Sequence, residues 1–255
     1  MMDKKIYYNA PCGLFHGFLD DELSRKKVLK DVLDFACWQV YEKHSDIKDE
    51  ETRFQRVREI LGFCNGDKED IIKRGESLAS LHANEPFFSI QGDIYWNFRN
   101  TFKSDEECAM LIAYLALKSI CGKRQWAKTN KAMWLSRMDG KIRPEYKKVK
   151  GKPELDISDS LSKYKSKYGI RRLRALLFEY YKVSFYSKCV HGFCFSTTLS
   201  LVDLIFAIKN EQSDAKRIDS ILNAATQKAE AAVEKAMAKK AELIENKEDA
   251  NDVPF

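Results

Sequence analysis

The chain has 255 residues, with 44 Lys and Arg against 38 Asp and Glu, a formal net charge of +6, and 44% hydrophobic residues. This length allows one large or two modest domains, and the apolar content is too high for a disordered chain. No stretch approaches the ~18 uninterrupted apolar residues of a membrane span, and the N-terminus has no signal-peptide apolar run. We therefore expect a globular cytoplasmic protein that does not enter a membrane.

The charge is distributed unevenly along the chain. Residues 1–117 hold 16 basic and 21 acidic side chains, residues 118–188 hold 20 and 6, and residues 189–255 hold 8 and 11. The small total is a cancellation between a basic centre and acidic flanks. Such a centre is typical of a surface that binds nucleic-acid phosphates, and the alternative is that its lysines only solvate a surface.

The first hundred residues read as helices. Apolar residues at three- and four-residue steps predict helices over 24–44, 49–63 and 67–82, and the aromatic run 92–102 fits a strand or a helix. We therefore expect a helical module over 1–103. It has no ordered Ser, His and Asp set, no HExxH and no phosphate-binding glycine loop, so we expect no enzyme and no cofactor.

The next segment has the pattern of a helix-turn-helix. Ser104, followed by three acids, predicts the start of an apolar helix that ends at Cys121-Gly122. A second helix over 123–141 would place aromatic and Met side chains at helical spacing. The basic stretch IRPEYKKVKGKP after it reads as a mobile loop that reaches a phosphate backbone.

Residues 157–208 follow a definite order of elements. A short helix begins at Ser158 or Asp159, a turn falls at Gly169, and a longer helix carries Arg171 near its start. Alternating residues on either side of Cys-Val-His-Gly predict a β-hairpin, and a helix follows over 199–208.

This order, in DISDSLSKYKSKYGIRRLRALLFEYYKVSFYSKCVHGFCFS, resembles winged-helix domains. The resemblance implies a DNA-binding region over 104–210 whose recognition helix presents its N-terminal arginines to a groove, although the family also contains protein-binding members. Lysines would contact phosphates, and exposed tryptophans would stack on unpaired bases, unless they belong to the core. The candidate nucleic-acid-binding residues are Lys123, Arg124, Trp126, Lys128, Lys131, Trp134, Lys147, Lys148, Lys150, Lys165, Lys167, Arg171, Arg172, Arg174 and Lys188.

The cysteines do not predict a metal site. Seven cysteines lie mostly in apolar stretches, as reduced buried thiols do. Cys189, His191 and Cys194 offer zinc-ligand chemistry, but the spacing is irregular, no fourth ligand is near, and His-Gly fits a hairpin turn. We expect no metal.

The C-terminal region is different in composition. Residues 211–244, rich in Ala, Lys and Glu, predict a long helical stalk that would pair chains as a homo-oligomer. Residues 245–255, ENKEDANDVPF, form an acidic tail. This ending resembles the C-terminal tip of bacterial single-stranded-DNA-binding proteins, which finishes in Asp-Asp-Ile-Pro-Phe.

That resemblance implies capture of the tail by host replication and repair enzymes. Phe255 would fill an apolar pocket, Pro254 and Val253 would stiffen and extend the contact, and Asp252 would be the flanking acid. The chain departs from the family at Asn251 and Val253, and it lacks the strands of an OB barrel.

We therefore expect a mainly α protein: a helical module, a winged-helix-like region with a β-hairpin, a long C-terminal helix and an acidic tail. The leading hypothesis is a non-enzymatic DNA-binding protein of phage or mobile-element type. It would act in replication or recombination, bind single-stranded DNA and recruit host proteins through its tip. One alternative is a duplex-binding winged-helix replication initiator or transcriptional regulator. Another is an interaction module that imitates the single-stranded-DNA-binding-protein tail.

Overall fold

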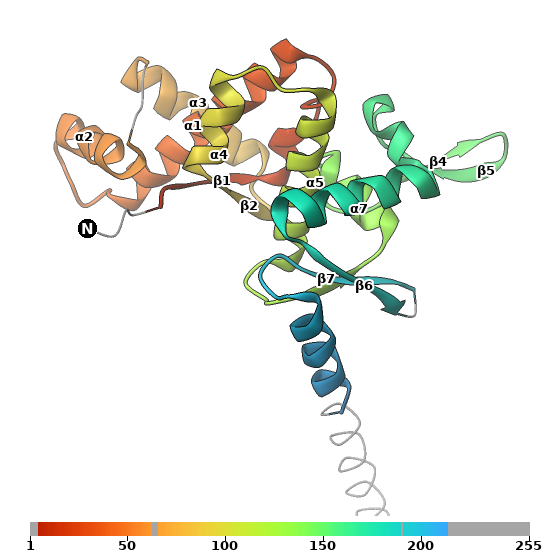
Figure 1. The fold of residues 1–255 in the computed structure, drawn as a ribbon. Helices are drawn as coiled ribbons and strands as arrows, with labels where there is room; N and C mark the ends of the chain where they lie inside the picture. The colour runs from red at the N-terminus through yellow and green to blue at the C-terminus, as the bar shows by residue number, and fades with distance from the viewer. Residues whose placement is uncertain (1–4, 63–65, 190, 214–255) are drawn as a thin grey trace, which may run out of the picture. The chain divides into compact units, whose positions relative to one another are not determined.

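Figure 1 shows the computed structural model, which describes residues 5–62, 66–189 and 191–213. The chain divides into one compact unit that ends at Leu204 and a second unit that begins at Ile205. Buried apolar side chains from Tyr8 to Phe195 form one continuous core, so the expected boundary at residue 103 does not separate two cores. The described residues 201–213 are helical. The expected stalk beyond residue 213 and the acidic tail lie outside the described residues.

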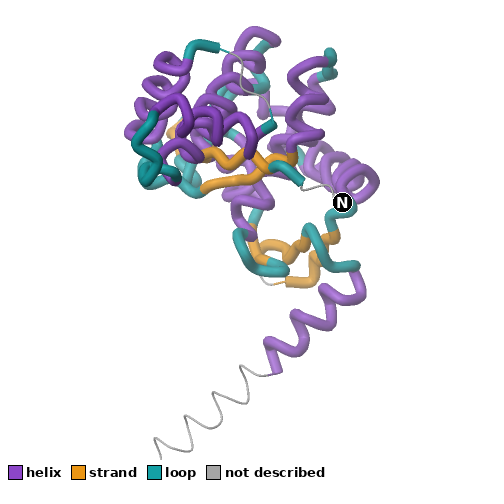
Figure 2. The backbone as a smooth tube through the Cα atoms, turned by 90° about the vertical axis from the view of Figure 1, so that its left-hand side faces the viewer, coloured by secondary structure: helices purple, strands orange, loops and turns teal. Residues whose placement is uncertain are grey.

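Helices surround a two-stranded ribbon in the first half of the compact unit. The elements are β1 (Tyr7–Pro11), η1 (Cys12–Phe15), α1 (Glu22–Lys43), α2 (Glu50–Leu61), α3 (Lys68–Leu81), β2 (Phe87–Gln91) and α4 (Gly92–Asn100). β1 pairs antiparallel with β2, although their ends are separated by three helices in the chain. Figure 2 shows these strands running among the helices. The three predicted helices are present, and the aromatic run forms a helix.

Helix α5 (Asp105–Cys121) joins the two halves of the unit. Ser104 and Glu107 cap its first turn reciprocally, each side chain accepting a hydrogen bond from the other residue's backbone N–H, as the sequence predicts. Nearly every residue from Cys108 to Leu117 is buried. The helix contacts β2 on one side and α6 and α7 on the other, so it is the common core element of both halves.

The second half combines helices with two small sheets. Its elements are β3 (Ala127–Thr129), α6 (Lys131–Met138), β4 (Tyr146–Val149), β5 (Lys152–Leu155), η2 (Asp159–Lys165), α7 (Lys167–Tyr181), β6 (Ser184–Cys189) and β7 (Gly192–Ser196). β3, β7 and β6 form an antiparallel sheet in that order, and β4 and β5 form a separate hairpin. Ala127 lies opposite Phe195, so distant segments close this sheet.

Three local expectations are wrong. The predicted helix over 123–141 starts only at Lys131, because residues 127–129 pair with β7 instead. The predicted mobile loop is the β4–β5 hairpin. Gly169 lies inside α7 and not in a turn, because Ser166 caps the helix three residues earlier. The predicted β6–β7 hairpin is present.

Among the described residues, no helix has both the length and the apolar character that crossing a membrane requires.

Candidate nucleic-acid interface

Helix α7 presents two cations on its exposed side near its N-terminus. Ile170, Leu173 and Leu177 are buried, whereas Lys167 and Arg171 are exposed and lie one helical turn apart. In the described part of the chain, neither has an ion-pair partner within 4.0 Å. The positive end of the helix dipole adds to their charge. This end of α7 is therefore suited to an anionic ligand.

Arg172, the next residue along, is held within the protein. Its guanidinium lies 2.7 Å (Nε to Oε1) and 3.1 Å (Nη2 to Oε2) from the carboxylate of Glu106 in the first turn of α5. This bidentate pair raises the pKa of Arg172. The pair ties α7 to α5 at the surface, so Arg172 is less available to an outside anion than Arg171.

Arg174 lies inward, against the three-stranded sheet. Its guanidinium carbon is 3.9 Å from the ring centroid of Phe193 and 5.4 Å from that of Phe185, and Nη1 donates to Ser187 Oγ at 3.2 Å. Burial lowers the pKa of Arg174. The expectation that Arg174 faces a DNA groove does not fit this position, because its guanidinium packs α7 onto the sheet.

Strand β6 contacts α7 at two points. Val183 N donates to Leu177 O near the end of the helix, and Arg174 Nη1 donates to Ser187 Oγ. His191, in the turn between β6 and β7, is exposed.

A close backbone approach fixes this turn. Gly192 has a φ of 135°, and a Cβ there would lie 2.2 Å from the carbonyl oxygen of Thr129 in β3. Only glycine fits at this position. Lys188 belongs to β6, and its side chain lies outside the described residues.

The base of the β4–β5 hairpin is a network of ion pairs. Lys147 Nζ is 3.1 Å from Asp156 Oδ1, and Lys165 Nζ is 2.9 Å from Glu154 Oε1. Lys131 Nζ donates to the carbonyl oxygen of Lys165 at 2.9 Å. These three predicted phosphate contacts thus have partners inside the protein. The pKa of Asp156 is lowered by its hydrogen bonds to Lys147 and Lys141, and that of Glu154 by Lys165.

Three lysines at the far end of the hairpin have no such partner. Lys148, Lys150 and Lys152 are exposed, and no ion pair joins them to any described carboxylate. Lys148 and Lys150 were predicted. Lys152 was missed. The Lys-Gly-Lys sequence was the available signal, because Gly favours a tight turn, which leaves Lys150 and Lys152 at the same end of the hairpin.

The predicted residues after α5 divide between exposed and structural roles. Arg124 donates to the carbonyl oxygens of Ile120 and Cys121, so its guanidinium caps the C-terminus of α5. Lys123 and Lys128 are exposed without an ion pair in the described ranges. Trp126 is half-buried.

Trp134 belongs to the core. Its side chain is fully buried, and its indole N–H donates to Ala113 O in α5 at 3.1 Å. Its ring lies 5.7 Å from that of Phe193 and 6.0 Å from that of Phe185. The expectation that Trp134 stacks on an unpaired base is wrong, because no base reaches a fully buried ring.

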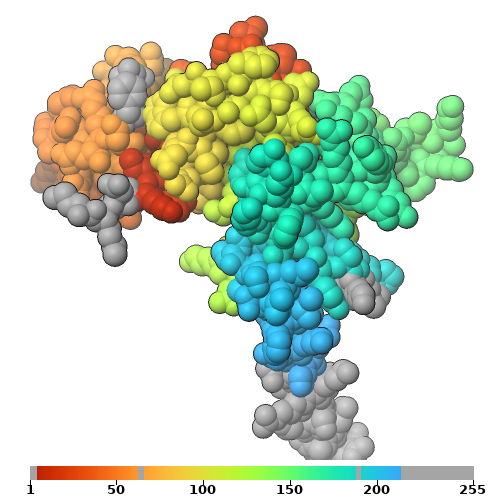
Figure 3. Space-filling view, in the orientation of Figure 1, coloured from red at the N-terminus to blue at the C-terminus, as the bar shows by residue number. Residues whose placement is uncertain are grey.

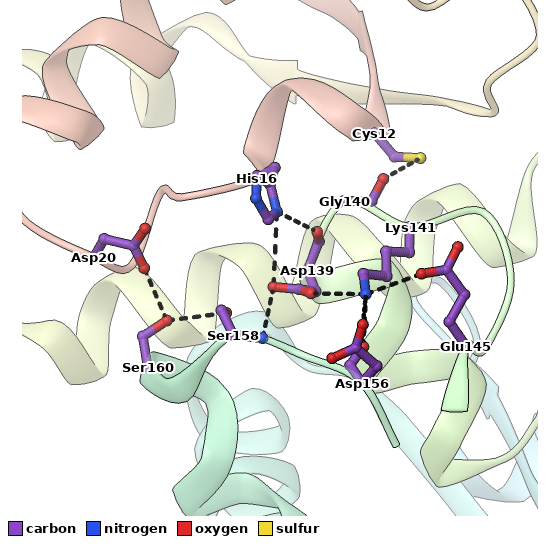
Figure 4. Close-up of polar contacts among 10 residues, drawn as sticks. All are labelled: Cys12, His16, Asp20, Asp139, Gly140, Lys141, Glu145, Asp156, Ser158 and Ser160. Carbon is purple, nitrogen blue, oxygen red and sulfur yellow. Dashed lines mark hydrogen bonds and ion pairs between the residues drawn. The ribbon is translucent and has the colours of Figure 1, made fainter. Parts of the chain in front are cut away.

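A polar cluster fixes the segment between α6 and the hairpin (Figure 4). Lys141 Nζ lies 3.0 Å from Glu145 Oε2, 3.1 Å from Asp156 Oδ2 and 3.9 Å from Oδ2 of the buried Asp139. Asp139 accepts a hydrogen bond from the backbone N–H of Ser158, and its carbonyl oxygen lies 3.2 Å from His16 Nδ1. The cluster joins η1, the end of α6 and the start of η2.

The described cysteines, Cys12, Cys37, Cys108, Cys121 and Cys194, are buried. No group of three His, Cys, Asp or Glu side chains suited to a metal occurs among the residues the structure describes. The side chain of Cys189 falls outside them. Burial raises the pKa of the Cys12 thiol to about 11, which disfavours a nucleophilic thiolate.

The predicted partner-binding residues Asp252, Val253, Pro254 and Phe255 lie outside the described residues. The surface that remains is made of Lys167 and Arg171 on α7, the β6–β7 turn, and the lysines of the β4–β5 hairpin. No protein family, curated protein or solved structure matches this chain.

Proposed function

We propose that this chain is a non-enzymatic protein that binds duplex DNA through a winged-helix unit spanning residues 105–196. The observation that carries the proposal is the sheet order β3-β7-β6, formed around α5, α6 and α7. A winged-helix unit has this plan: helix, strand, two helices, then a hairpin that completes the sheet. In this plan α7 is the recognition helix and the β6–β7 turn is the wing.

The exposed end of α7 fits this role. A recognition helix places its N-terminal residues against base edges in the major groove. Arg171 is exposed and has no ion pair among the described residues, so its guanidinium would be able to bind a guanine edge with two hydrogen bonds. Lys167 would bind a phosphate. In this plan the exposed His191 lies in the wing.

Duplex DNA is favoured over the single-stranded DNA of our leading sequence-based hypothesis. The stacking argument rested on Trp126 and Trp134, and the burial of Trp134 removes half of it. The tail resembles the part of single-stranded-DNA-binding proteins that binds other proteins. It therefore does not indicate that this chain binds a single strand.

A competition experiment tests this proposal. Fluorescence anisotropy would compare a mixed-sequence duplex with each of its separate strands at ~50 and ~200 mM salt. We expect tighter binding to the duplex and a steep loss of affinity with salt. Equal or tighter binding to single strands would overturn the duplex assignment, and the absence of a salt dependence would overturn nucleic-acid binding altogether.

We also propose, from the sequence resemblance, a role in replication or recombination with recruitment of host proteins by residues 252–255. A purified bacterial enzyme that binds the single-stranded-DNA-binding-protein tip is the partner to test. Phe255→Ala should abolish binding to this enzyme and leave DNA affinity unchanged. Phe102→Ala, at an 81% exposed phenylalanine of the compact unit, is the matched control. Unchanged enzyme binding by Phe255→Ala would refute the tip assignment.

A further inference from the structure

We propose that the β4–β5 hairpin is a second DNA-binding arm, which contacts phosphates beside the groove occupied by α7. The inference rests on the proposed duplex binding and adds a separate contact outside the winged-helix plan, since the hairpin is inserted between α6 and α7. Four observations support it: the fold of the hairpin, its charge, its attachment and its reach.

The hairpin is a regular two-stranded ribbon. Tyr146 pairs with Leu155 and Val149 with Lys152, which leaves the two-residue turn Lys150-Gly151. The turn has φ values of 49° and 79°, which match the type I′ turn that two-residue hairpins prefer. A Cβ at Gly151 would meet nothing within 4 Å, so backbone conformation and not space requires the glycine. The ribbon is thus locally specified.

The end of the arm is purely cationic. Every residue of β4 and β5 is exposed except Leu155, which is half-buried at the base. Residues 148–152 contain three lysines and no acid. The acids at the base, Glu154 and Asp156, are already paired with lysines. Positive charge is therefore concentrated at the tip of the hairpin, and these lysines have no ion-pair partner among the described residues.

The attachment places the arm at the DNA-facing end of α7. Lys165, which pairs with Glu154 of β5, is two residues before the first residue of α7. Asp156 is held by Lys141 and Lys147, so both strands are fixed at the base. Figures 1 and 3 show the hairpin projecting beyond the body of the compact unit.

The reach of the arm matches the spacing of DNA. Four residues per strand give about 13 Å. The major groove is about 12 Å wide, so an arm that starts beside a helix in the groove extends across the neighbouring phosphate strand. A two-stranded ribbon is a known shape for DNA contacts. Lys148, Lys150 and Lys152 are therefore placed for phosphates and not for base edges.

The test is a charge-removal variant of the full chain, Lys148→Gln/Lys150→Gln/Lys152→Gln. The matched control, Lys27→Gln/Lys48→Gln/Lys73→Gln, removes the same charge from exposed positions of the helical half without a described ion pair. Affinity for a mixed-sequence duplex of about 30 base pairs would be measured across a salt series. Affinity falls as salt rises, so log affinity against log salt has a negative slope. Each lost phosphate contact makes this slope less steep by about 0.9.

Compared with the wild type, we expect the slope of the arm variant to be less steep by about 2 to 3, and that of the control variant by less than about 1. The duplexes selected from a random pool should be the same for the wild type and the arm variant, since phosphate contacts carry no sequence information. An unchanged slope in the arm variant, or an equal loss of steepness in the control variant, would overturn the proposed role of the hairpin but not the proposed duplex binding. A wild type that fails to bind duplex would instead overturn the proposed function, and the arm with it.

Discussion

The guanidinium of Arg174 lies over the ring of Phe193, with its central carbon 3.9 Å from the ring centroid. This contact joins α7 to the β3-β7-β6 sheet. Arg174→Ala should therefore destabilise the protein by roughly 1–3 kcal/mol, through lost cation–π attraction and packing. Chemical denaturation would measure the change. Arg143→Ala, at an exposed arginine, should stay within about 0.5 kcal/mol of the wild type. Equal effects in the two variants would contradict a special role for Arg174.

Glu106 holds Arg172 in an ion pair, and in the proposed complex its charge would repel DNA. Glu106→Gln removes one negative charge beside the start of α7 and releases Arg172 from its ion pair. We expect duplex binding to tighten by about two- to fivefold at low salt, and the gain to shrink at high salt. Glu59→Gln, which breaks an exposed ion pair with Arg56 in α2, is the control. Tightening by both variants would indicate a general charge effect without relation to α7.

We expect Arg171 to supply sequence preference in the proposed duplex complex. Arg171→Lys keeps the charge and loses the fork of donors that reads a guanine edge. The slope of affinity against salt should remain close to that of the wild type, while discrimination between the selected duplex and a mismatched one falls by about tenfold or more. Unchanged discrimination with an unchanged slope would assign Arg171 to phosphate. Arg56→Lys on α2 should change neither quantity.

Cys12 makes the stability of the protein sensitive to alkaline pH. Burial raises its pKa from the ordinary 9.0 to about 11, so the folded protein retains the thiol proton more tightly than the unfolded chain. The contribution is fully present below pH 9 and is lost as pH rises through 11. The free-energy difference of unfolding between wild type and Cys12→Ala should fall by about 2 kcal/mol across this window. A constant difference from pH 8.5 to 11 would contradict the buried-thiol assignment.

Elements with local signals could be predicted from the sequence. The helices starting after Ser104 and Asp67 have side-chain caps and apolar residues at helical spacing, and both are present. The β6–β7 hairpin has alternating residues and a His-Gly turn. In each case the information lies within about twenty residues of chain, where periodicity and capping are sufficient.

Elements that depend on distant partners could not be predicted. β3 has only three residues and pairs with β7, some sixty-five residues later, so its own sequence favours the helix we expected. β4 and β5 have no apolar face, so the pattern of alternation is absent, and only Lys150-Gly151 marks the turn.

The candidate site shows the same division. The sequence locates the cations but does not say which have partners. Arg171 is exposed and Arg174 is packed on Phe193, although both are arginines near the start of one helix. The helical spacing of Trp134 is the same for a tryptophan in the core and for one that stacks on a base. Only tertiary packing distinguishes the two.

The pairing of β3 with β7 also orders events during synthesis. Ala127, Lys128 and Thr129 find their partners only in residues 193–195, so α6, the arm and α7 all lie within the loop that this pairing closes. A nascent chain that has emerged only as far as α7 lacks the strands onto which Arg174 and Trp134 pack. We therefore expect residues 105–196 to fold late and as one cooperative step, after Ser196 has left the ribosome.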